Sequence, residues 1–313
     1  MSYTCVDRGS TACPCILMES GQCYTCTMIQ YGRCDCSENW QGVCPYTEYV
    51  QNGRKSKPFA PVRQHRILEI KRYPPSLSVI TLECDANTWP IYRREGAYCM
   101  IMWKDWFVPV SVLSCGNYRR GKGFVDFAIN ESGPKTKGII EESVEGGHLR
   151  IKGPFYGGLK MKAGGENKPL AIVAGKGLAI MPVINNIADL GGRMFSCYLD
   201  CVKLSEDFVE DYISDIEYNP VDFATDLEIV ATKIKKDYEL CREITGASPQ
   251  VWLMVSPYYC EKLLELINID YDNLVLANHS NLCCGEGVCG SCSYTDKNGI
   301  TVKNCKCLFY ESV

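Results

Sequence analysis

The sequence predicts a multi-domain chain in which a β domain precedes an α/β domain and a cysteine-rich segment lies at each end. Short apolar runs between Gly and Pro turns fill residues 60 to 165, whereas continuous apolar runs alternate with helix-like segments over residues 166 to 278. Most of the 21 cysteines gather near the two ends. We therefore expect a cysteine-rich extension over residues 1 to 50, an antiparallel barrel, a small Rossmann-like doubly wound domain and a cysteine module over residues 279 to 313.

Composition argues against several classes of protein. The net charge of -4 gives no reason to expect nucleic acid as a partner. No apolar run reaches the roughly 18 residues that a membrane-spanning helix needs. The opening MSYTCVDRGS lacks the form of a secretory signal. We expect a cytoplasmic protein whose clustered thiols hold metal or do redox chemistry.

The β domain is predicted from six short apolar runs. These runs are HRILEIKRY, LSVITLEC, AYCMIMW, FVPVSVLS, GFVDFAI and HLRIKG. Many short strands at this spacing are typical of an antiparallel barrel or sandwich. The preceding stretch QNGRKSKP, residues 51 to 58, is predicted to be a linker.

The α/β domain begins with PLAIVAG, a continuous apolar run typical of a parallel strand covered on both faces. MFSCYLD, VWLMVS and NLVLAN are predicted as further strands, and GKGLAIMPVINNIADLGG and YYCEKLLELI as helices. DLEIVATKIKKDYELCREI shows both strand and helix patterns. The alternation indicates a small doubly wound domain. The acidic run SEDFVEDYISDIEY is expected to be a solvated face, or else a docking surface for a basic partner.

Four cysteines near the C-terminus follow a metal-binding spacing. Cys284, Cys289 and Cys292 form C-x4-C-x2-C, and Cys305 follows thirteen residues later. This is the plant-type spacing for a 2Fe–2S cluster, and the intervening glycines let the backbone wrap closely around one. Zinc and free thiols are the alternatives. Spacing alone does not separate Cys305 from Cys307 as the fourth ligand.

Eight more cysteines lie near the N-terminus, in the nearly palindromic spacing C-x7-C-x-C-x7-C-x2-C-x7-C-x-C-x7-C. They are Cys5, Cys13, Cys15, Cys23, Cys26, Cys34, Cys36 and Cys44. A segment with so few aliphatic side chains needs metal or cross-links in place of a core. Eight thiolates fill two four-ligand sites, so 4Fe–4S clusters, structural zinc, and disulfides or free thiols all stay open. The seven cysteines between the two ends are expected to be buried hydrophobes.

The order of barrel, α/β domain and C-terminal 2Fe–2S module resembles the ferredoxin reductase superfamily. Within it, the sequence is similar to the electron-transfer subunit of dihydroorotate dehydrogenase, to sulfide dehydrogenase-like FAD/NAD-binding proteins, and to the small subunit of NADH-dependent ferredoxin:NADP oxidoreductase. The resemblance rests on CCGEGVCGSC with VKNC, on EGGHLRIKGPFYGG and on PLAIVAGKGLAIMP. It covers about residues 60 to 310, so the N-terminal extension lies outside it.

The resemblance implies that the barrel binds FAD. The family's flavin motif corresponds to Val108, Pro109, Val110, Ser111 and Val112. Pro109, Ser111 and Val112 match it, whereas the family's arginine and aromatic residue are absent. Loss of the arginine removes a bidentate phosphate contact.

The resemblance also implies a phosphate-binding turn at residues 133 to 138. Lys135, Thr136, Lys137 and Gly138 are its candidate contacts. Amides at the start of the following helix could hold a pyrophosphate, and the two lysines could supply the missing positive charge. The alternative is a solvated charged turn.

For a nicotinamide nucleotide, the family's glycine turn corresponds to Gly175, Gly177 and Ala179. A short glycine turn is weak evidence by itself. The family's Cys-Gly-Pro strand end is replaced by residues 255 to 257, Val-Ser-Pro. Asp200 is a candidate for binding a ribose. NAD(P)H binding therefore stays open against a scaffold that receives electrons from a partner.

These features predict a flavin and iron–sulfur electron-transfer subunit of an oxidoreductase. It would pass electrons between a nicotinamide or a partner flavin and a partner protein, through FAD and a 2Fe–2S cluster. The expected partners are a catalytic oxidoreductase subunit, in a hetero-oligomer, and ferredoxin, and the expected host is an anaerobic bacterium. No catalytic residue is identified. The alternative is a non-catalytic metal-binding structural or assembly protein on a degenerate reductase scaffold.

Overall fold

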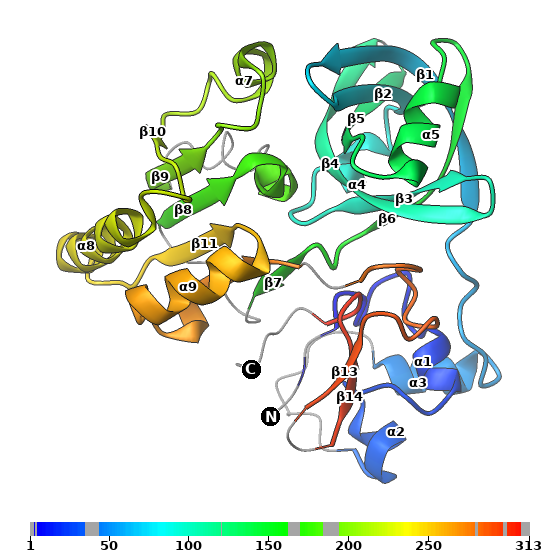
Figure 1. Ribbon diagram of the computed structural model, residues 1–313. Helices are drawn as coiled ribbons and strands as arrows, with labels where there is room; N and C mark the ends of the chain where they lie inside the picture. The colour runs from blue at the N-terminus through cyan, green and yellow to red at the C-terminus, as the bar shows by residue number, and fades with distance from the viewer. Residues whose placement is uncertain are drawn as a thin grey trace.

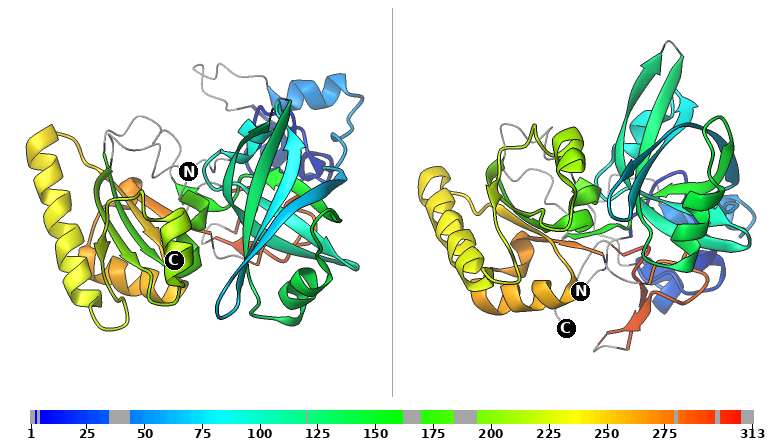
Figure 2. Two further views of the ribbon diagram at one scale, coloured as in Figure 1. Left: turned by 90° about the horizontal axis from the view of Figure 1, so that it is seen from above. Right: turned by 45° about the horizontal axis from the view of Figure 1, so that its top comes forward.

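A closed barrel and an open sheet are the two main bodies of the chain (Figure 1). The computed structural model describes residues 3, 5–34, 44–119, 121–161, 170–183, 194–278, 281–296 and 299–307. The two views of Figure 2 show the barrel and the sheet side by side, with the long helix α8 on the outer side of the sheet. Among the described residues, no helix is both long and apolar enough to cross a membrane.

The barrel has six strands in the order β1-β2-β5-β4-β3-β6, and every neighbouring pair is antiparallel. Its elements are β1 (Val62–Tyr73), β2 (Leu77–Asp85), α4 (Trp89–Tyr92), β3 (Tyr98–Trp103), β4 (Trp106–Arg119), β5 (Lys122–Asn130), α5 (Pro134–Glu142) and β6 (His148–Phe155). Its interior contains alternating apolar side chains such as Ile80, Leu82, Phe127 and Ile129. The predicted antiparallel barrel is therefore confirmed.

Asp126 is a buried carboxylate in this barrel, where it accepts hydrogen bonds from the hydroxyls of Thr81, at 2.7 Å, and Ser114. Burial raises the pKa of Asp126, and the two hydroxyls only partly oppose that shift. The folded protein therefore keeps a proton that the unfolded chain has already lost, and stability falls as the pH rises through that interval. Between about pH 4 and pH 7, we expect the thermal midpoint of Asp126→Asn to rise relative to that of wild type as the pH increases. Asp215→Asn, at an exposed carboxylate, serves as the control and should show no such trend.

The open sheet has the strand order β10-β9-β8-β11-β12-β7, with β7 antiparallel at one edge and the other neighbours parallel. Its strands are β7 (Leu159–Met161), β8 (Ala171–Lys176), β9 (Met194–Asp200), β10 (Asn219–Pro220), β11 (Gln250–Met254) and β12 (Leu274–Ala277). Its helices are η2 (Gly177–Val183), α7 (Glu206–Tyr212), α8 (Leu227–Thr245), α9 (Pro257–Ile267) and η3 (Tyr271–Asn273). The four apolar runs predicted as strands all lie in this sheet.

Each face of the sheet has its own core. On one face, Ile172 and Leu253 pack with Val230 and Ile234 of α8 and Leu263 of α9. The core of the other face joins Val173, Trp252 and Phe208 of α7 to the barrel residues Tyr73 and Leu77. The barrel and the sheet therefore share one hydrophobic core at their boundary.

One sequence prediction in this region is wrong. DLEIVATKIKKDYELCREI forms the single helix α8, because its buried residues Val230, Ile234, Tyr238 and Cys241 recur at helical spacing. The acidic residues of the run SEDFVEDYISDIEY are all exposed, as predicted, whereas its apolar residues face inward. Its Phe208 is fully buried, with its ring centroid 5.2 Å from that of Tyr73.

The described parts of the N- and C-terminal segments pack together. Their elements are α1 (Ile16–Glu19), α2 (Thr27–Tyr31), α3 (Pro45–Gln51), β13 (Ser293–Thr295) and β14 (Thr301–Lys303). The amide of Val6 donates to the carbonyl of Lys306 at 2.9 Å, and Cys5 forms an isolated β-bridge with Cys307. Tyr3, Leu17, Tyr24 and Val302 lie in the small core between the segments. We call this unit the cysteine module.

The predicted linker, residues 51 to 58, contains no strand, and no helix beyond the last residue of α3, and it connects the N-terminal segment with the barrel. Residues 45 to 51 form α3, and the amide of Lys57 donates to the carbonyl of Pro14 at 2.8 Å. The Lys57 ammonium lies 2.7 Å from the carboxylate of Glu48. These contacts hold the start of the barrel close to the N-terminal segment.

Candidate functional site

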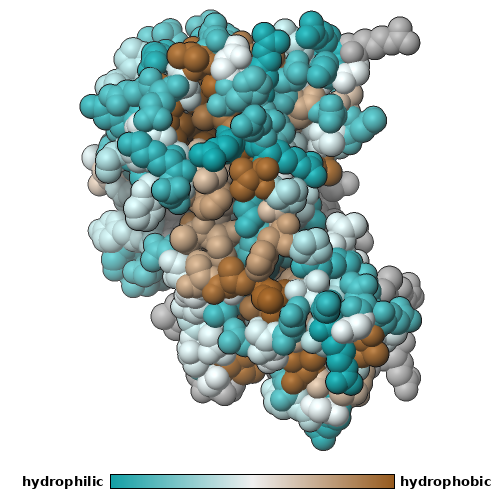
Figure 3. Space-filling view, turned by 90° about the vertical axis from the view of Figure 1, so that its right-hand side faces the viewer, coloured by the Kyte–Doolittle hydropathy of each residue, from teal (hydrophilic) through white to brown (hydrophobic). Residues whose placement is uncertain are grey.

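Two adjoining cavities lie where the barrel, the sheet and the cysteine module meet. The inner cavity has a volume of about 200 Å³ and is lined from β3, β4, η2, the end of β12 and Leu282. The outer cavity, of about 520 Å³, is lined from β4, the start of α5 and the loop that contains Cys283. Pro109 and Leu282 line both cavities. In Figure 3, apolar side chains gather across the middle of the molecule, between the barrel above and the cysteine module below.

The inner cavity borders a buried hydroxyl group that has no hydrogen-bond partner. Tyr98 lines this cavity and is 2% exposed, and its hydroxyl oxygen finds no partner in the described part of the chain. An unsatisfied buried polar group costs about 1–3 kcal/mol, and this hydroxyl oxygen exposes almost no surface to the cavity. The sequence did not indicate that Tyr98 lies at a cavity, because AYCMIMW has the composition of a core strand.

The outer cavity contains the first turn of α5. Gly133 is the N-cap, and the Thr136 hydroxyl exchanges hydrogen bonds with its carbonyl, at 3.0 Å, and its amide, at 3.2 Å. Helix α5 is thus held with its N-terminus at the cavity, where the helix dipole favours an anion. The Lys135 ammonium lies over the Trp106 ring, 4.4 Å from its centroid.

Several residues predicted to bind the flavin line these cavities. Pro109, Val110 and Ser111 line the inner cavity, and Pro109, Lys135 and Thr136 line the outer one. Ala179, which was predicted for the nicotinamide nucleotide, also lines the inner cavity, so residues from both the barrel and the sheet domain meet there.

Three other residues predicted for the flavin site lie away from both cavities. Val112 belongs to the barrel core, and Lys137 points to solvent, 3.7 Å from Glu141. Gly138 is buried against Trp103, whose ring a Cβ at Gly138 would approach to 2.3 Å. Its glycine is therefore explained by the packing of α5 on the barrel.

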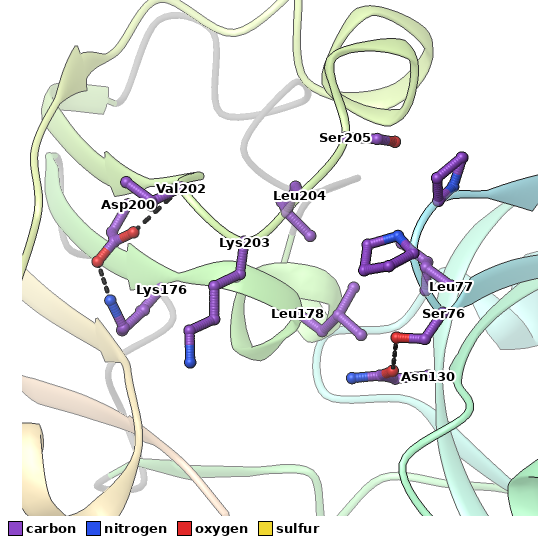
Figure 4. Close-up of a pocket in the computed structure, with 13 residues that line it drawn as sticks. Ser76, Leu77, Asn130, Lys176, Leu178, Asp200, Val202, Lys203, Leu204 and Ser205 are labelled. Atoms are coloured by element: carbon purple, nitrogen blue, oxygen red, sulfur yellow. Dashed lines mark hydrogen bonds and ion pairs between the residues drawn. The ribbon is translucent and has the colours of Figure 1, made fainter.

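A third cavity, of about 580 Å³, lies between the barrel and the carboxyl ends of β8 and β9 (Figure 4). Gly177 lines it, and Lys203 extends toward its centre. Gly175 lies beneath, where a Cβ would meet Ile180 and Leu199 at 3.3 Å.

The carboxylate of Asp200 is engaged inside the sheet domain. It is 1% exposed, forms an ion pair with Lys176, and accepts hydrogen bonds from the amides of Val202, at 3.2 Å, and Phe223, at 3.0 Å. Figure 4 shows Lys176 directed at this carboxylate. Asp200, the candidate ribose ligand, also lines the third cavity, with its carboxylate engaged by these donors.

The four C-terminal cysteines with ferredoxin-like spacing come together. The thiol of Cys284 is in hydrogen-bond contact with Cys305 and Cys289, and Cys305 is also in contact with Cys292. The amide of Glu286 donates to the Cys284 sulfur at 3.3 Å, and the amide of Cys305 to the Cys292 sulfur at 3.4 Å. The hydrogen bond from the Cys305 thiol, with those from backbone amides, lowers the pKa of Cys284 and Cys292 against the effect of burial.

Glycine is required beside this cysteine loop. Gly285 has φ +70°, and a Cβ there would lie 2.8 Å from the Phe155 ring. The loop therefore packs directly on the end of β6.

Lys160 is a buried cation beside the same loop. It is 3% exposed and donates to the carbonyls of Asn304 and Cys307, both at 3.4 Å, and to the Asn304 side chain. Burial lowers the pKa of Lys160 to about 8, although the negative charge of nearby cysteines opposes the shift. The sequence gave no indication of this role, because the contact joins residues that are far apart in the chain.

The N-terminal cysteines form a looser group within the described residues. Cys5, Cys15 and Cys23 pack beside the small core of the cysteine module, whereas Cys34 is exposed. Burial raises the pKa of Cys13 to about 11. Cys26 and Cys44 flank the starts of α2 and α3, and the predicted ligand Cys36 lies outside the described residues.

No group of three or more His, Cys, Asp or Glu side chains in the described part of the chain is placed to hold a single metal ion. Among the described residues, neither the N-terminal nor the C-terminal set of cysteines forms such a group. Of the seven cysteines between them, Cys84, Cys99, Cys197 and Cys241 are buried, which agrees with the predicted packing role.

No protein-family model and no curated protein matches the chain. Solved structures do match its fold. The structure of the NADH-dependent reduced ferredoxin-NADP oxidoreductase aligns over 80% of this chain and 86% of its own, with a TM-score of 0.54 and 14% identity. Phthalate dioxygenase reductase, described as a modular structure for electron transfer from pyridine nucleotides to 2Fe–2S, aligns over 78% of this chain and 94% of its own, with a TM-score of 0.52 and 13% identity.

An intact type IV self-sufficient cytochrome P450 monooxygenase also matches, with a TM-score of 0.51 and 14% identity. The match covers 83% of this chain but only 42% of the monooxygenase. The fold is therefore that of the ferredoxin reductases, as the sequence resemblance predicted.

Proposed function

We propose that this chain is the flavin and iron–sulfur electron-transfer subunit of an oxidoreductase. The observation that carries the proposal is that the two adjoining cavities lie against the loop whose four cysteines are in contact. A cofactor in the cavities and a cluster on the cysteines would be neighbours. Such a pair suits a protein that takes electrons two at a time and passes them on singly.

The residues of the two cavities fit FAD. The inner cavity offers apolar surface from Val110, Leu178 and Tyr98, which suits a flat ring. The outer cavity offers the start of α5 and the Lys135 side chain, which suit a pyrophosphate. Bound FAD would supply two-electron and one-electron redox chemistry.

The cysteine loop fits a 2Fe–2S cluster. Each iron of such a cluster takes two thiolates, so the ligands need not surround a single point as they do for one zinc ion. The contacts of Cys305 with Cys284 and Cys292 favour Cys305 over Cys307 as the fourth ligand. Amide donors to the sulfurs of Cys284 and Cys292 would stabilise the reduced state.

In this proposal the chain forms a hetero-oligomer, as the dihydroorotate dehydrogenase electron-transfer subunit does. It receives its electrons from the partner subunit. Ferredoxin is the other proposed partner. The engaged carboxylate of Asp200 argues against NAD(P)H as the donor, whereas Lys203 at the third cavity leaves a cation for a nucleotide phosphate. The N-terminal cysteines are proposed to hold a further 4Fe–4S cluster or zinc within the cysteine module.

An anaerobic preparation of the full chain tests the proposal. We expect one FAD per chain, about two cluster irons from the C-terminal set, and visible absorption that dithionite bleaches. Bleaching by NADH would show nicotinamide use; bleaching by dithionite alone would favour a partner as the donor. A colourless protein without flavin would contradict the proposal.

That colourless outcome would support a second candidate, a non-catalytic metal-binding protein on a reductase scaffold. Val108 stands where the family has an arginine, and Lys137 points away from the outer cavity. Zinc in place of iron, with an unaltered fold, would be the positive evidence for this function.

A further inference from the structure

We propose that Lys160 is the buried counter-charge of the C-terminal 2Fe–2S cluster and raises the reduction potential of that cluster. The net charge around a cluster is one of the factors that set its potential. A fixed positive charge favours the reduced cluster, because that form carries one more negative charge than the oxidised form. This inference rests on the proposed function, because it concerns the cluster assigned to Cys284, Cys289, Cys292 and Cys305.

The first step is how the fold directs Lys160 at the cysteine module. Lys160 belongs to the edge strand β7, where it is paired with Leu276 of β12. Its neighbour Leu159 packs in the core that the sheet shares with the barrel. Successive side chains of a strand point to opposite faces, so Lys160 points away from this core and reaches the segment that contains Cys305.

The second step is the contact of Lys160 with that segment. Its ammonium group donates to the carbonyls of Asn304 and Cys307, both at 3.4 Å, and to the side chain of Asn304. These two residues flank Cys305, whose own amide donates to the Cys292 sulfur at 3.4 Å. The ammonium group therefore contacts the backbone on both sides of the proposed fourth ligand.

The third step is that the charge of Lys160 is not balanced by any described residue. Lys160 is 3% exposed, and no carboxylate in the described part of the chain forms an ion pair with it. Lys306, on the same segment, is also 3% exposed but pairs with Asp7. The carbonyls satisfy the hydrogen bonds of Lys160 but bring no net negative charge. Because buried charges are usually paired, the thiolates of a bound cluster are the fitting partner.

The pKa of Lys160 agrees with this placement. Burial lowers the pKa to about 8, and the negative charges of Cys307, Cys292 and Cys305 oppose that shift. The ammonium group therefore lies within electrostatic range of two proposed cluster ligands, and it stays mostly protonated at neutral pH.

The redox step leaves Lys160 unchanged. Reduced flavin gives up one electron and the cluster gains it, while Lys160 keeps its proton and forms and breaks no bond. Its role is electrostatic, because it sets how readily that electron is held.

Lys160→Gln tests the charge, because glutamine keeps a hydrogen-bond donor but is neutral. In the full chain with its complete iron content, we expect the equilibrium constant for one-electron reduction of the cluster to fall about tenfold. That change lowers the midpoint potential by about 59 mV, which an anaerobic dithionite titration followed by EPR measures. A merely structural role would leave the potential unchanged.

Lys303→Gln is the matched control. Lys303 ends β14, two residues before Cys305, and its ammonium group donates to the Ser293 hydroxyl at 2.9 Å. Lys303 is partly exposed, so water screens its charge more strongly than that of Lys160. We expect a much smaller change in midpoint potential. An equal change in the two variants would contradict a particular role for the buried charge.

Lys160→Arg keeps the charge and decides the outcome if Lys160→Gln fails to hold iron. Iron in Lys160→Arg at the wild-type potential would support the inference. Loss of iron from both variants would show that Lys160 acts through the shape of its side chain and would overturn it. An unchanged potential in Lys160→Gln would overturn this inference alone, whereas a wild-type chain without iron would overturn the proposed function as well.

Discussion

Cys305→Ser is expected to remove the C-terminal cluster, with the loss of about two irons per chain and of the visible absorption that dithionite bleaches. The Cys305 thiol is in contact with both Cys284 and Cys292, and it is 1% exposed. A serine hydroxyl at this position is a poorer ligand for iron than a thiolate. The measurement is iron content and absorption of chains purified anaerobically.

Cys307→Ser is the matched control for this prediction. Cys307 is also buried, at 0% exposed, lies only two residues further along the chain, and forms a β-bridge with Cys5. The same chemical change should therefore leave the C-terminal iron in place. If Cys307→Ser lost the iron and Cys305→Ser kept it, the choice of fourth ligand would be wrong.

The two cysteines show what spacing in a sequence is able to predict. The C-x4-C-x2-C pattern selects three residues, because these ligands lie on one short loop. The fourth comes from the end of β14, and its position depends on how the chain returns to that loop. Lys160 holds this return through the carbonyls of Asn304 and Cys307. A contact between residues so far apart in the chain has no local signal.

The barrel could be predicted because its strands are short apolar runs separated by Gly and Pro turns. Helix α8 was missed as a single helix because its β-branched residues, such as Ile229, Val230 and Ile234, also suit a strand. What decides the outcome is that Val230, Ile234 and Tyr238 all pack in the core on one face of the sheet. Tertiary packing therefore overrides local propensity here.

The pairing of Lys176 with Asp200 could have been predicted from the sequence. Asp200 ends the predicted strand MFSCYLD and Lys176 directly follows the predicted strand PLAIVAG, and parallel neighbours in a sheet bring their carboxyl ends together. The register of β8 and β9 places Lys176 directly beside Asp200. Reading the two strand ends separately left Asp200 as a ribose ligand; reading them as neighbours would have predicted the ion pair.

Asp7→Asn is expected to have the largest effect on stability, because it leaves a buried ammonium group without its partner. Lys306 is 3% exposed and forms an ion pair with Asp7, the link between the first and last described segments. Burial alone lowers the pKa of Lys306, but the charge of Asp7, the hydrogen bond to it and the charges of Cys5 and Cys15 together outweigh burial and raise it. Breaking a buried pair from one side costs about 3–5 kcal/mol, and here the cost falls on the packing of the N-terminal segment against β14.

The double variant Asp7→Asn/Lys306→Met separates the pair from the packing around it. With both charges removed, no buried charge is left unpaired, so the double variant should be more stable than Asp7→Asn alone. Lys262→Met is the surface control, since its pair with Glu265 is 46% and 64% exposed, and it should change the free energy of unfolding by less than about 1 kcal/mol. Urea unfolding and limited proteolysis of the N-terminal segment measure both effects. A double variant as unstable as Asp7→Asn would show that Asp7 acts by shape and hydrogen bonding, and that the charge of Lys306 is not what holds the two ends of the chain together.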